Sequence, residues 1–397
     1  MNLRQLFLQH NAQTSPAPLA LEIVRAEGCY LYDSSGRAYL DGIGGISVAN
    51  TGHRHPGVVE AIRRQLDAYL HVMVYGEFVQ SPQVRYAQLL AEHLPAHLHS
   101  VYFTNSGAEA VEGALKLAKR LTGRPGIAAF NQSYHGSTQG ALSIIGDEYW
   151  RNAYRPLLPG IRHLQYGSYD DLKAIDGQTA CVVAETVQAE AGVRSPEPGW
   201  LQALRQRCSE TGALLVLDEI QAGFGRTGTL WAFEQYGVEP DILLLGKALG
   251  GGLPLGAFIT SKEKMDALTD APVLGHITTF GGHPLCCAAG HAALETLLQE
   301  QWIGQVREKE ALFRALLVHP LIRQVHSAGL WLAVEFDSFA TCKAVIDRCI
   351  ERGLVTDWFL FAAHCLRLSP PLSISGEEIR AACRMITGAA EAVQQHT

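Results

Sequence analysis

The sequence lacks an excess of basic residues and long runs of apolar residues. Lys and Arg number 32 against 39 Asp and Glu, the formal net charge is −7, and the basic residues are scattered along the chain. Nucleic acids and anionic membrane surfaces attract clustered positive charge, so we expect neither as a partner. No apolar run approaches the roughly 18 residues of a membrane span, and the amino-terminal segment does not read as a signal peptide. These absences favour chemistry on small molecules.

The cysteines do not form a pattern typical of disulfides or of a zinc site. There are nine of them, an odd number, without any C-x-x-C pair, and Cys286 is directly followed by Cys287. A disulfide framework or a zinc site needs paired cysteines at suitable spacing. We therefore expect a cytoplasmic protein without a structural metal.

The 397 residues, 47% of them hydrophobic, are enough for a large core and for two domains. Short apolar runs alternate with helical segments between about residues 100 and 260, which is typical of an α/β fold with a mainly parallel sheet covered on both faces. The runs are residues 100–105, 126–131, 181–186, 213–220, 241–247 and 256–261.

After about residue 290 the apolar residues follow long helical periods. Residues 288–317 have a helical pattern, and residues 329–336 and 364–375 resemble strands, so a smaller α+β domain is expected. Ser34, Ser35 and Gly36 predict the turn of a hairpin near the amino terminus. We predict an N-terminal segment (1–45) that packs with the small domain, a large domain (46–288) and the small domain (289–397).

A carboxylate and a lysine each end an apolar run. Asp218 lies in "LLVLDEIQAGFGRTG" (214–228) and Lys247 in "ILLLGKALGGGLPLGA" (242–257). Carboxyl ends of parallel strands meet in one crevice, so both side chains should face it. Pyridoxal phosphate (PLP) needs an acid that keeps its ring nitrogen protonated and a desolvated lysine that attacks its aldehyde. A direct salt bridge between the two, a metal site of Asp218 and Glu219, and a lysine that reaches solvent are open alternatives.

The segment "FTNSGAEAVEGALKLAKR" (103–120) offers a seat for a phosphate. Ser106, Gly107 and Ala108 open a helix, and helix N-termini present unpaired amides to anions. An ordinary helix with Ser106 or Asn105 as its N-cap is an alternative interpretation of the same segment.

Further candidate side chains flank this pair. Tyr134 and His135 precede a glycine, where an aromatic ring can stack on a planar cofactor, although such aromatics are also common in cores. Gln221 follows Asp218 closely enough to reach the cofactor's phenolic oxygen. Arg367, in a probable strand, can bind a carboxylate bidentately or pair with a nearby acid.

Eight ordered motifs resemble those of the class III, PLP-dependent aminotransferases, and especially the acetylornithine and ornithine aminotransferase branch, over essentially the whole chain. The motifs are GHRHP (52–56), FTNSGAEAVEGALKLAK (103–119), YHGST (134–138), ETVQAEAGV (185–193), LLVLDEIQAGFGRTG (214–228), GKALGGGLPLGA (246–257), TTFGGHP (278–284) and RLSPPL (367–372). The resemblance implies PLP-dependent transferase fold type I, with a seven-stranded sheet in the large domain.

The resemblance also implies roles for individual residues. Lys247 bonds covalently to PLP, Asp218 pairs with its ring nitrogen, Gln221 contacts the phenolic oxygen and Tyr134 stacks on the ring. Thr279 reaches the phosphate from the neighbouring subunit, which implies a homodimer with shared active sites. The full cofactor-binding set is Ser106, Gly107, Ala108, Tyr134, His135, Glu185, Asp218, Gln221, Lys247 and Thr279.

The substrate-binding positions match the family only in part. Arg367 is similar to the arginine that holds the α-carboxylate of glutamate, and Glu190 to the acid that masks it when the amine donor is bound. Ser137 stands where an arginine is usual and Ile46 where ornithine enzymes have a tyrosine, so a distal substrate carboxylate has lost its usual partners. Arg151 or Arg155 could replace them, and Tyr75 is a further candidate for the donor pocket.

We therefore expect an aminotransferase that moves an amino group from an ω-amino donor, acetylornithine-like or related, to 2-oxoglutarate by a ping-pong mechanism. A PLP-dependent aminomutase or racemase is the alternative on the same fold. The glycines at 250–252 suggest a nicotinamide-dependent dehydrogenase as a further alternative. It is remote because G-x-G-x-x-G does not follow an early strand.

Overall fold

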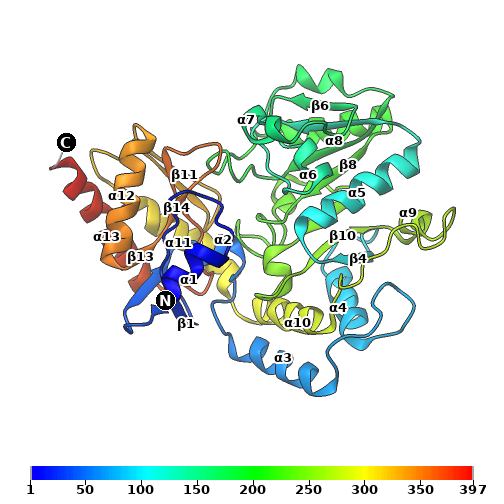
Figure 1. Cartoon of the computed structure of the whole chain (residues 1–397). Coiled ribbons are helices and arrows are strands. Elements are labelled where there is room, and N and C mark those ends of the chain that lie inside the picture. The colour runs from blue at the N-terminus through cyan, green and yellow to red at the C-terminus, as the bar shows by residue number, and fades with distance from the viewer. Residues whose placement is uncertain (1, 396–397) are drawn as a thin grey trace.

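A seven-stranded sheet forms the centre of the larger part of the molecule in the computed structural model, which describes residues 2–395 (Figure 1). The strand order is β4-β10-β9-β8-β7-β5-β6; β10 runs antiparallel to both neighbours, and the pairs from β9 to β6 are parallel. The strands are β4 (Ser100–Thr104), β5 (Gly126–Phe130), β6 (Ile161–Leu164), β7 (Thr179–Glu185), β8 (Leu214–Asp218), β9 (Ile242–Leu245) and β10 (Gly256–Thr260). The predicted mainly parallel sheet is confirmed.

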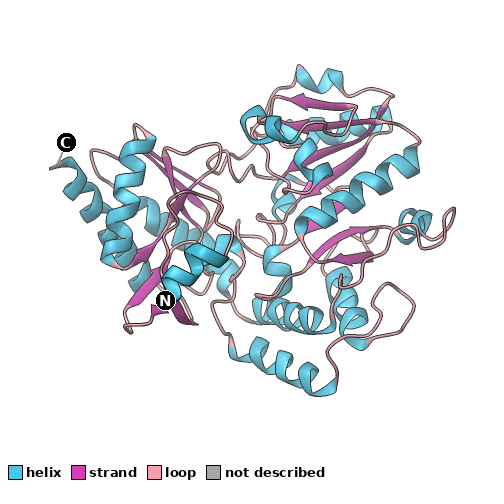
Figure 2. Cartoon of the chain, in the orientation of Figure 1, coloured by secondary structure: helices cyan, strands magenta, loops and turns pink. Residues whose placement is uncertain are grey.

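Both faces of this sheet are buried, which explains why its strands are apolar throughout rather than alternating. Alternate residues of β8 belong to different clusters: Val216 packs with helix α5 (Gly107–Thr122), and Leu215 and Leu217 pack on the side of α8 (Trp200–Thr211). Helices therefore cover the sheet from two sides (Figure 2). The other helices of this part are α3 (Pro56–Ala68), α4 (Ser81–Glu92), α6 (Gln139–Ser143), α7 (Glu148–Arg151), α9 (Lys262–Met265) and α10 (Pro284–Gln299).

The smaller part contains an antiparallel sheet of order β11-β12-β15-β14 and three long helices. The strands are β11 (Gln324–Ser327), β12 (Leu332–Glu335), β14 (Asp357–Trp358) and β15 (Cys365–Leu368). The helices are α11 (Trp302–Leu316), α12 (Phe339–Arg352) and α13 (Gly376–Gln394). Residues 288–317, for which the sequence predicted long helical periods, divide between α10 and α11.

The amino-terminal segment adds a second small sheet of order β1-β2-β3-β13. It begins with α1 (Leu3–His10), and its strands are β1 (Ile23–Glu27), β2 (Tyr30–Asp33), β3 (Ala38–Asp41) and β13 (Leu354–Val355). The predicted hairpin is confirmed, because β2 pairs antiparallel with β3 and the Asp33 side chain accepts hydrogen bonds from the amides of the turn. Strand β3 in turn pairs parallel with β13 of the smaller part.

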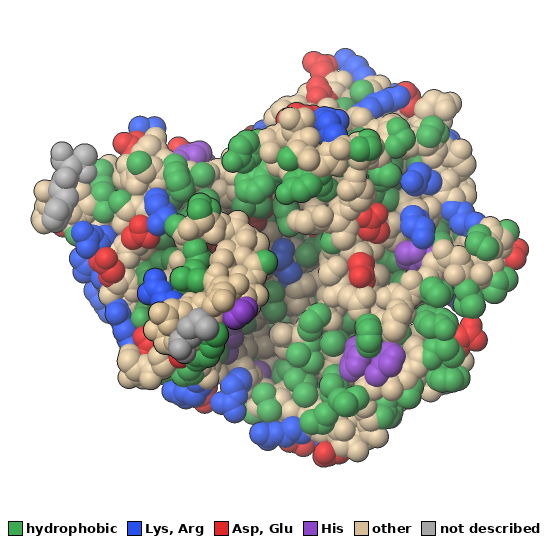
Figure 3. Space-filling view, viewed as in Figure 1, with side chains coloured by type: hydrophobic (Ala, Val, Ile, Leu, Met, Phe, Trp, Pro, Cys, Tyr) green, Lys and Arg blue, Asp and Glu red, His purple; other side chains and the backbone are tan. Residues whose placement is uncertain are grey.

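The two parts border a hollow that opens on the face drawn in Figure 3. Helix α10 (Pro284–Gln299) spans residue 288, where the sequence predicted the border between the domains, and the domain boundaries stay a prediction. Among the described residues, no helix is long and apolar enough to cross a membrane.

Candidate active site

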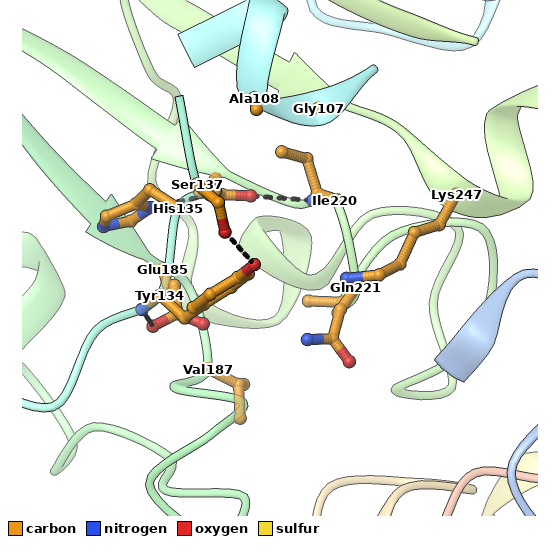
Figure 4. A pocket seen from close by; sticks show the side chains of 13 residues that line it. Gly107, Ala108, Tyr134, His135, Ser137, Glu185, Val187, Ile220, Gln221 and Lys247 are labelled. Atoms are coloured by element: carbon orange, nitrogen blue, oxygen red, sulfur yellow. Dashed lines mark hydrogen bonds and ion pairs between the residues drawn. The ribbon is translucent and has the colours of Figure 1, made fainter. Parts of the chain in front are cut away.

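A cavity lies where β7 and β8 end and α5 begins. Its empty volume is about 660 Å³, including its open mouth. The lining residues are Gly107, Ala108, Tyr134, His135, Gly136, Ser137, Glu185, Val187, Asp218, Ile220, Gln221, Ala222 and Lys247 (Figure 4). Eight of the predicted cofactor-binding residues are therefore brought together from segments far apart in the sequence.

Asp218 ends β8 with its carboxylate held by two partners. Oδ2 lies 2.7 Å from Nδ1 of His135, and Oδ1 accepts a hydrogen bond of 2.9 Å from the amide of Ile220. The other ring nitrogen of His135, Nε2, is buried without a partner. In the sheet register, Glu185 of β7 lies opposite Asp218. Burial, followed by the charge of Asp218, raises the pKa of Glu185 well above its usual range.

Glu219 does not share a site with Asp218. Its carboxylate accepts hydrogen bonds from the hydroxyl of Thr186 and from the amides of Ala232 and Phe233, each at 2.7 Å. Burial raises the pKa of Glu219 to about 7. Because the two carboxylates have different partners, the structure does not support the metal site considered from the sequence. Among the described residues, no three His, Cys, Asp or Glu side chains form a group that could hold a metal ion.

Lys247 begins the short helix η4 (Lys247–Gly250) directly after β9, with φ at +48°. A positive φ is rare for a residue with a side chain, and such strain often accompanies functional sites. The amine extends into the cavity (Figure 4). Burial lowers the pKa of Lys247 to about 8, although the nearby Glu190 and Asp218 oppose this shift. The described residues contain no ion pair between Lys247 and Asp218, so the structure does not support the direct salt bridge considered from the sequence.

The amino-terminal end of α5 faces the cavity with small residues. Ser106 is the N-cap, and its hydroxyl accepts a hydrogen bond from the amide of Glu109, so the capping interpretation is right for this side chain. Gly107 and Ala108 line the cavity, whereas Ser106 is not among its lining residues. A Cβ atom on Gly107 would lie 2.7 Å from Cδ1 of Ile220, so a larger residue would require the Ile220 side chain to move. The first amides of the helix have no intrahelical acceptor and can bind an anion.

Tyr134 and Gln221 line the cavity from opposite loops (Figure 4). The Tyr134 hydroxyl lies 3.2 Å from the hydroxyl of Ser137. Gln221 donates a long hydrogen bond of 3.4 Å from Nε2 to Glu190, while its Oε1 is buried without a partner. Gln221 thus links the cavity to the next group of charged residues.

Arg367 and Glu190 form a buried pair beside the cavity. Nη1 and Nη2 of Arg367 donate to the two carboxylate oxygens of Glu190 at 2.9 and 2.8 Å. Burial alone would raise the pKa of Glu190, but the Arg367 guanidinium holds it below its usual value. The structure therefore shows Arg367 bonded to a nearby acid, which was one of the two interpretations of the sequence. The guanidinium can bind a substrate carboxylate only after Glu190 moves.

Other predicted residues lie outside the cavity. Thr279 is exposed, and Tyr75 lines a separate cavity together with Thr278. Arg151 contacts His163 and Glu148, and Arg155 also contacts Glu148, so neither arginine is among the lining residues.

Ile46 adopts an unusual backbone conformation, and it too is absent from the lining of the cavity. Residues 44–47 have positive φ in succession, with φ at +61° and ψ at +60° for Ile46. The left-handed region is unfavourable for a β-branched residue, so the neighbouring structure must hold this turn in place.

Sequence reasoning did not single out several cavity residues. Val187, Ile220 and Ala222 line the cavity with Gly136. Val187 and Ile220 follow closely on the strands that carry Glu185 and Asp218, so their positions after the strand ends could have indicated them. Asp357, which lies 2.9 Å from Nε of Arg367, had no such signal because the contact depends on the pairing of β14 with β15.

Comparisons with known proteins agree with this geometry. The family model "Aminotransferase class-III" matches residues 11–390. The chain belongs to the class-III aminotransferases. It is 39% identical to the acetylornithine aminotransferase of Methanopyrus kandleri, over 99% of this chain and 100% of that protein. It is also 39% identical to the acetylornithine aminotransferase of Bacillus subtilis, over 90% and 92%.

Solved structures of aminotransferases share the fold of this class-III aminotransferase. The ornithine aminotransferase of Toxoplasma gondii aligns with a TM-score of 0.92 and 31% identity, covering 100% of this chain and 97% of that one. A second structure of that enzyme, at 32% identity and also with a TM-score of 0.92, has partial occupancy of PLP at its active site; it covers 99% of this chain and 94% of that one. The family and fold type I, both predicted from the sequence, are confirmed.

Proposed function

We propose that this class-III aminotransferase uses PLP to transfer the amino group of an ω-amino donor, acetylornithine-like or related, to 2-oxoglutarate by a ping-pong mechanism. The observation that carries the proposal is the meeting of Lys247, Asp218 and the start of α5 in one cavity. The relatives named acetylornithine aminotransferases support the donor class.

The residues of the cavity fit PLP. The amides of Gly107 and Ala108 would hold the phosphate, and the ring of Tyr134 would lie against the cofactor ring. Asp218 would keep the ring nitrogen protonated, and His135 fixes the orientation of its carboxylate through the contact of 2.7 Å. Gln221 can donate from Nε2 to the phenolic oxygen, because the present bond of Nε2 to Glu190 is long. When bound, PLP acts as an electron sink for the carbon that carries the amino group.

Lys247 is the group that moves protons at that carbon. Its pKa of about 8 leaves a substantial fraction of the amine neutral near neutral pH, so it can accept a proton as a base and return it as an acid. The apolar strand β9 before it and the short helix η4 after it limit the directions in which the amine can move.

Arg367 and Glu190 would divide the two half-reactions between them. With Glu190 in place, the guanidinium is masked and an uncharged part of the amine donor can lie beside it. When Glu190 moves, Nη1 and Nη2 can receive the α-carboxylate of 2-oxoglutarate in the same bidentate geometry. An exchange of Glu190 for the acceptor carboxylate favours a transferase, because an aminomutase or racemase needs no second substrate.

The cavity has an uncharged side chain, Ser137, where the distal end of the donor would lie. Ser137 lines the cavity where relatives of the ornithine type carry an arginine, and its hydroxyl lies beside that of Tyr134. Loss of one charge-assisted hydrogen bond weakens carboxylate binding by about 1.5 to 3 kcal/mol. We therefore propose that the chain prefers donors whose distal end does not depend on a cationic partner at this position.

A homodimer with shared active sites is part of the proposal. The segment that carries Thr279 exposes large apolar side chains, including Ile277 and Phe280, and the loop beside it exposes Val79, which is 94% accessible. The rings of His71 and Phe280 lie 4.9 Å apart and join these two loops. Such a surface favours association with a second copy, which would bring its Thr279 towards the phosphate. Phe280→Asp should lower the mass measured by sedimentation to that of one chain.

We further propose that the enzyme is cytoplasmic, which agrees with its nine free cysteines, all of them buried. Family membership argues against a nicotinamide-dependent dehydrogenase, and the glycines at 250–252 lie in the turn after Lys247 rather than at the start of a long helix.

A donor panel tests the proposed function directly. The purified, PLP-loaded chain should form glutamate from 2-oxoglutarate with at least one of acetylornithine, succinylornithine, ornithine, 4-aminobutyrate and lysine. Initial rates at varied donor and acceptor should give the parallel double-reciprocal lines of a ping-pong mechanism. Conversion of a donor without any glutamate formation would favour the aminomutase or racemase instead.

A further inference from the structure

The guanidinium of Arg367 is contacted by two carboxylates on different sides. Glu190 occupies Nη1 and Nη2, whereas Oδ1 of Asp357 lies 2.9 Å from Nε. Asp357 and Arg367 face each other across the antiparallel pair of β14 and β15. Neither Nε nor Oδ1 makes an aligned hydrogen bond, so this second contact is an ion pair that acts through charge and proximity.

Residues 358 and 359 also contact the guanidinium of Arg367. Nη2 donates to the backbone carbonyl of Trp358 at 3.0 Å, and Cζ lies 4.4 Å from the centre of the Phe359 ring. Together with Asp357 these contacts hold one edge and one face of the planar group. Removal of Glu190 would therefore free only the Nη1–Nη2 edge and leave the orientation of the guanidinium fixed.

The charges around Arg367 indicate that Asp357 stays paired with the guanidinium when Glu190 moves away. Burial raises the pKa of Asp357 to about 6, with Arg367 opposing the shift and Glu190 and Asp41 adding to it. Asp357 is thus ionised at pH 7.5. With both acids present, the guanidinium is outnumbered by two carboxylates; without Glu190, one cation still faces one carboxylate. Arg367 never becomes an unpaired buried charge, a state that proteins avoid.

We propose that Asp357 is a positioning residue that holds the Nε side of Arg367 while the Nη1–Nη2 edge exchanges Glu190 for the carboxylate of the 2-oxo acid acceptor. This inference rests on the proposed function, in which Arg367 receives the acceptor. Asp357 acts through Arg367, so it affects acceptor binding and leaves the amine donor, which does not use the guanidinium, little changed.

The test uses the full-length, PLP-loaded enzyme with the substitutions Asp357→Ala, Asp357→Asn and Asp357→Glu. In single-turnover measurements of each half-reaction, Asp357→Ala should raise the apparent Kd for 2-oxoglutarate about tenfold, equivalent to about 1.4 kcal/mol. The value for the donor should change less than twofold. Calorimetric titration with glutarate, a five-carbon dicarboxylate that cannot accept an amino group, should show the same tenfold weakening without any turnover.

The other two variants separate charge from shape. Asp357→Glu, which restores a carboxylate, should recover most of the affinity for glutarate. Asp357→Asn, which keeps an oxygen but not the charge, should recover less. Asp357→Asn also preserves the size of the side chain, so it tests the inference even when Asp357→Ala does not fold.

Two controls accompany these variants. Glu335→Ala removes a carboxylate of the same sheet that is similarly accessible, 24% against 29%, but pairs with His326, and it should leave glutarate binding unchanged. Arg367→Ala should abolish most glutarate binding. If Arg367→Ala weakens glutarate binding but the Asp357 variants do not, the inference is wrong and the proposed function stands. If Arg367→Ala has no effect, both are wrong. Equal weakening of donor and acceptor by Asp357→Ala also overturns the inference.

Discussion

Lys247 combines a strained backbone with an amine that is easily deprotonated. Its φ is +48°, and burial lowers its pKa to about 8. Since only the neutral amine attacks an aldehyde, covalent attachment of PLP to Lys247 should become about tenfold faster per pH unit below pH 8 and level off above it. The rate can be followed by the visible absorption of the bound cofactor after PLP is mixed with the cofactor-free chain at pH 6 to 10.

Surface lysines provide the comparison for this pH profile. At a lysine with the ordinary pKa of about 10.4, attachment should keep accelerating well beyond pH 8. Borohydride reduction followed by peptide mass spectrometry assigns the site, and Lys247→Ala should remove the attachment that levels off. A plateau above pH 10 for the peptide that contains Lys247 would contradict a desolvated amine.

Glu219 is a structural acid beside the catalytic candidates. Each of its oxygens accepts a hydrogen bond from a backbone amide, of Ala232 and Phe233. Glu219→Gln would turn an NH2 group towards one of these N–H donors and should destabilise the fold by about 1 to 3 kcal/mol. Urea denaturation monitored by tryptophan fluorescence at pH 8 measures this loss. An unchanged midpoint would mean that these amides have other acceptors.

The pH dependence of stability gives a second measure of Glu219. Its pKa is about 7 in the fold, against an ordinary value of 4.5, so between these pH values the folded chain holds a proton that the unfolded chain releases. The contribution of Glu219 to stability is therefore complete below pH 4.5 and is lost as the pH rises towards 7. In Glu219→Gln this part of the pH dependence should be absent, which comparison of urea midpoints at pH 5 and pH 8 would show.

Single residues at strand ends could be predicted from the sequence, whereas their partners could not. Asp218 and Lys247 interrupt apolar runs, and a charge at the end of a buried strand indicates a site. The contact of His135 with Asp218 and that of Asp357 with Arg367 join segments whose pairing no local pattern specifies.

At the scale of helices and strands, the apolar runs of the large sheet were sufficient to locate most of it. The exception is β6, Ile161–Leu164, which contains Arg162 and His163 and lies at the edge of the sheet. Arg162 is half exposed there and pairs with Asp176, so the strand has no apolar period to recognise. Strand β14 has only two residues, too few for any pattern.

Helix α5 is held against the sheet by a close contact at Gly113. A Cβ atom at this position would lie 2.3 Å from the ring of Phe258, which is itself stacked on Tyr102. Overpacking costs about 1 to 3 kcal/mol, and the better helix propensity of alanine returns about 1 kcal/mol. Gly113→Ala should therefore destabilise the fold by up to about 2 kcal/mol, measured by urea denaturation.

The same substitution in another helix should have the opposite sign. In α13, a Cβ atom on Gly388 would meet Arg352 at 3.6 Å, an ordinary contact. Gly388→Ala should stabilise the fold by up to about 1 kcal/mol through helix propensity. If both variants are stabilised, the contact of α5 with Phe258 is looser than the structure has it, and the amides of Gly107 and Ala108 are less firmly placed.

At the scale of the whole molecule, Arg226 joins the two parts that border the hollow. It is fully buried, and it donates to the carbonyls of Leu330 and Pro370 in the smaller part and to the side chain of Asn50. Burial lowers the pKa of Arg226 to about 9. Lys247 lies in the larger part and Arg367 in the smaller, so the distance between them depends on this junction.

Arg226→Met should loosen this junction and destabilise the fold by about 2 to 4 kcal/mol, since buried carbonyls lose their donors while the cost of a buried charge is relieved. Arg226→Lys should be little better, because an ammonium group cannot span acceptors that a planar fork reaches. Arg205→Met is the matched control: Arg205 pairs with Asp241 at 2.7 Å within the larger part, partly exposed, and its loss should cost about 1 kcal/mol or less.

Urea denaturation can separate a lost contact from a lost junction. Trp331 lies in the smaller part and Trp200 in the larger, both fully buried, so each reports on its own part in a variant that keeps it and replaces the other five tryptophans by Phe. If Arg226 couples the parts, the two reporters should unfold together in the parent chain and at different urea concentrations after Arg226→Met. Coincident transitions in that variant would place the coupling elsewhere along the interface, because the two parts would still unfold as one unit without the guanidinium.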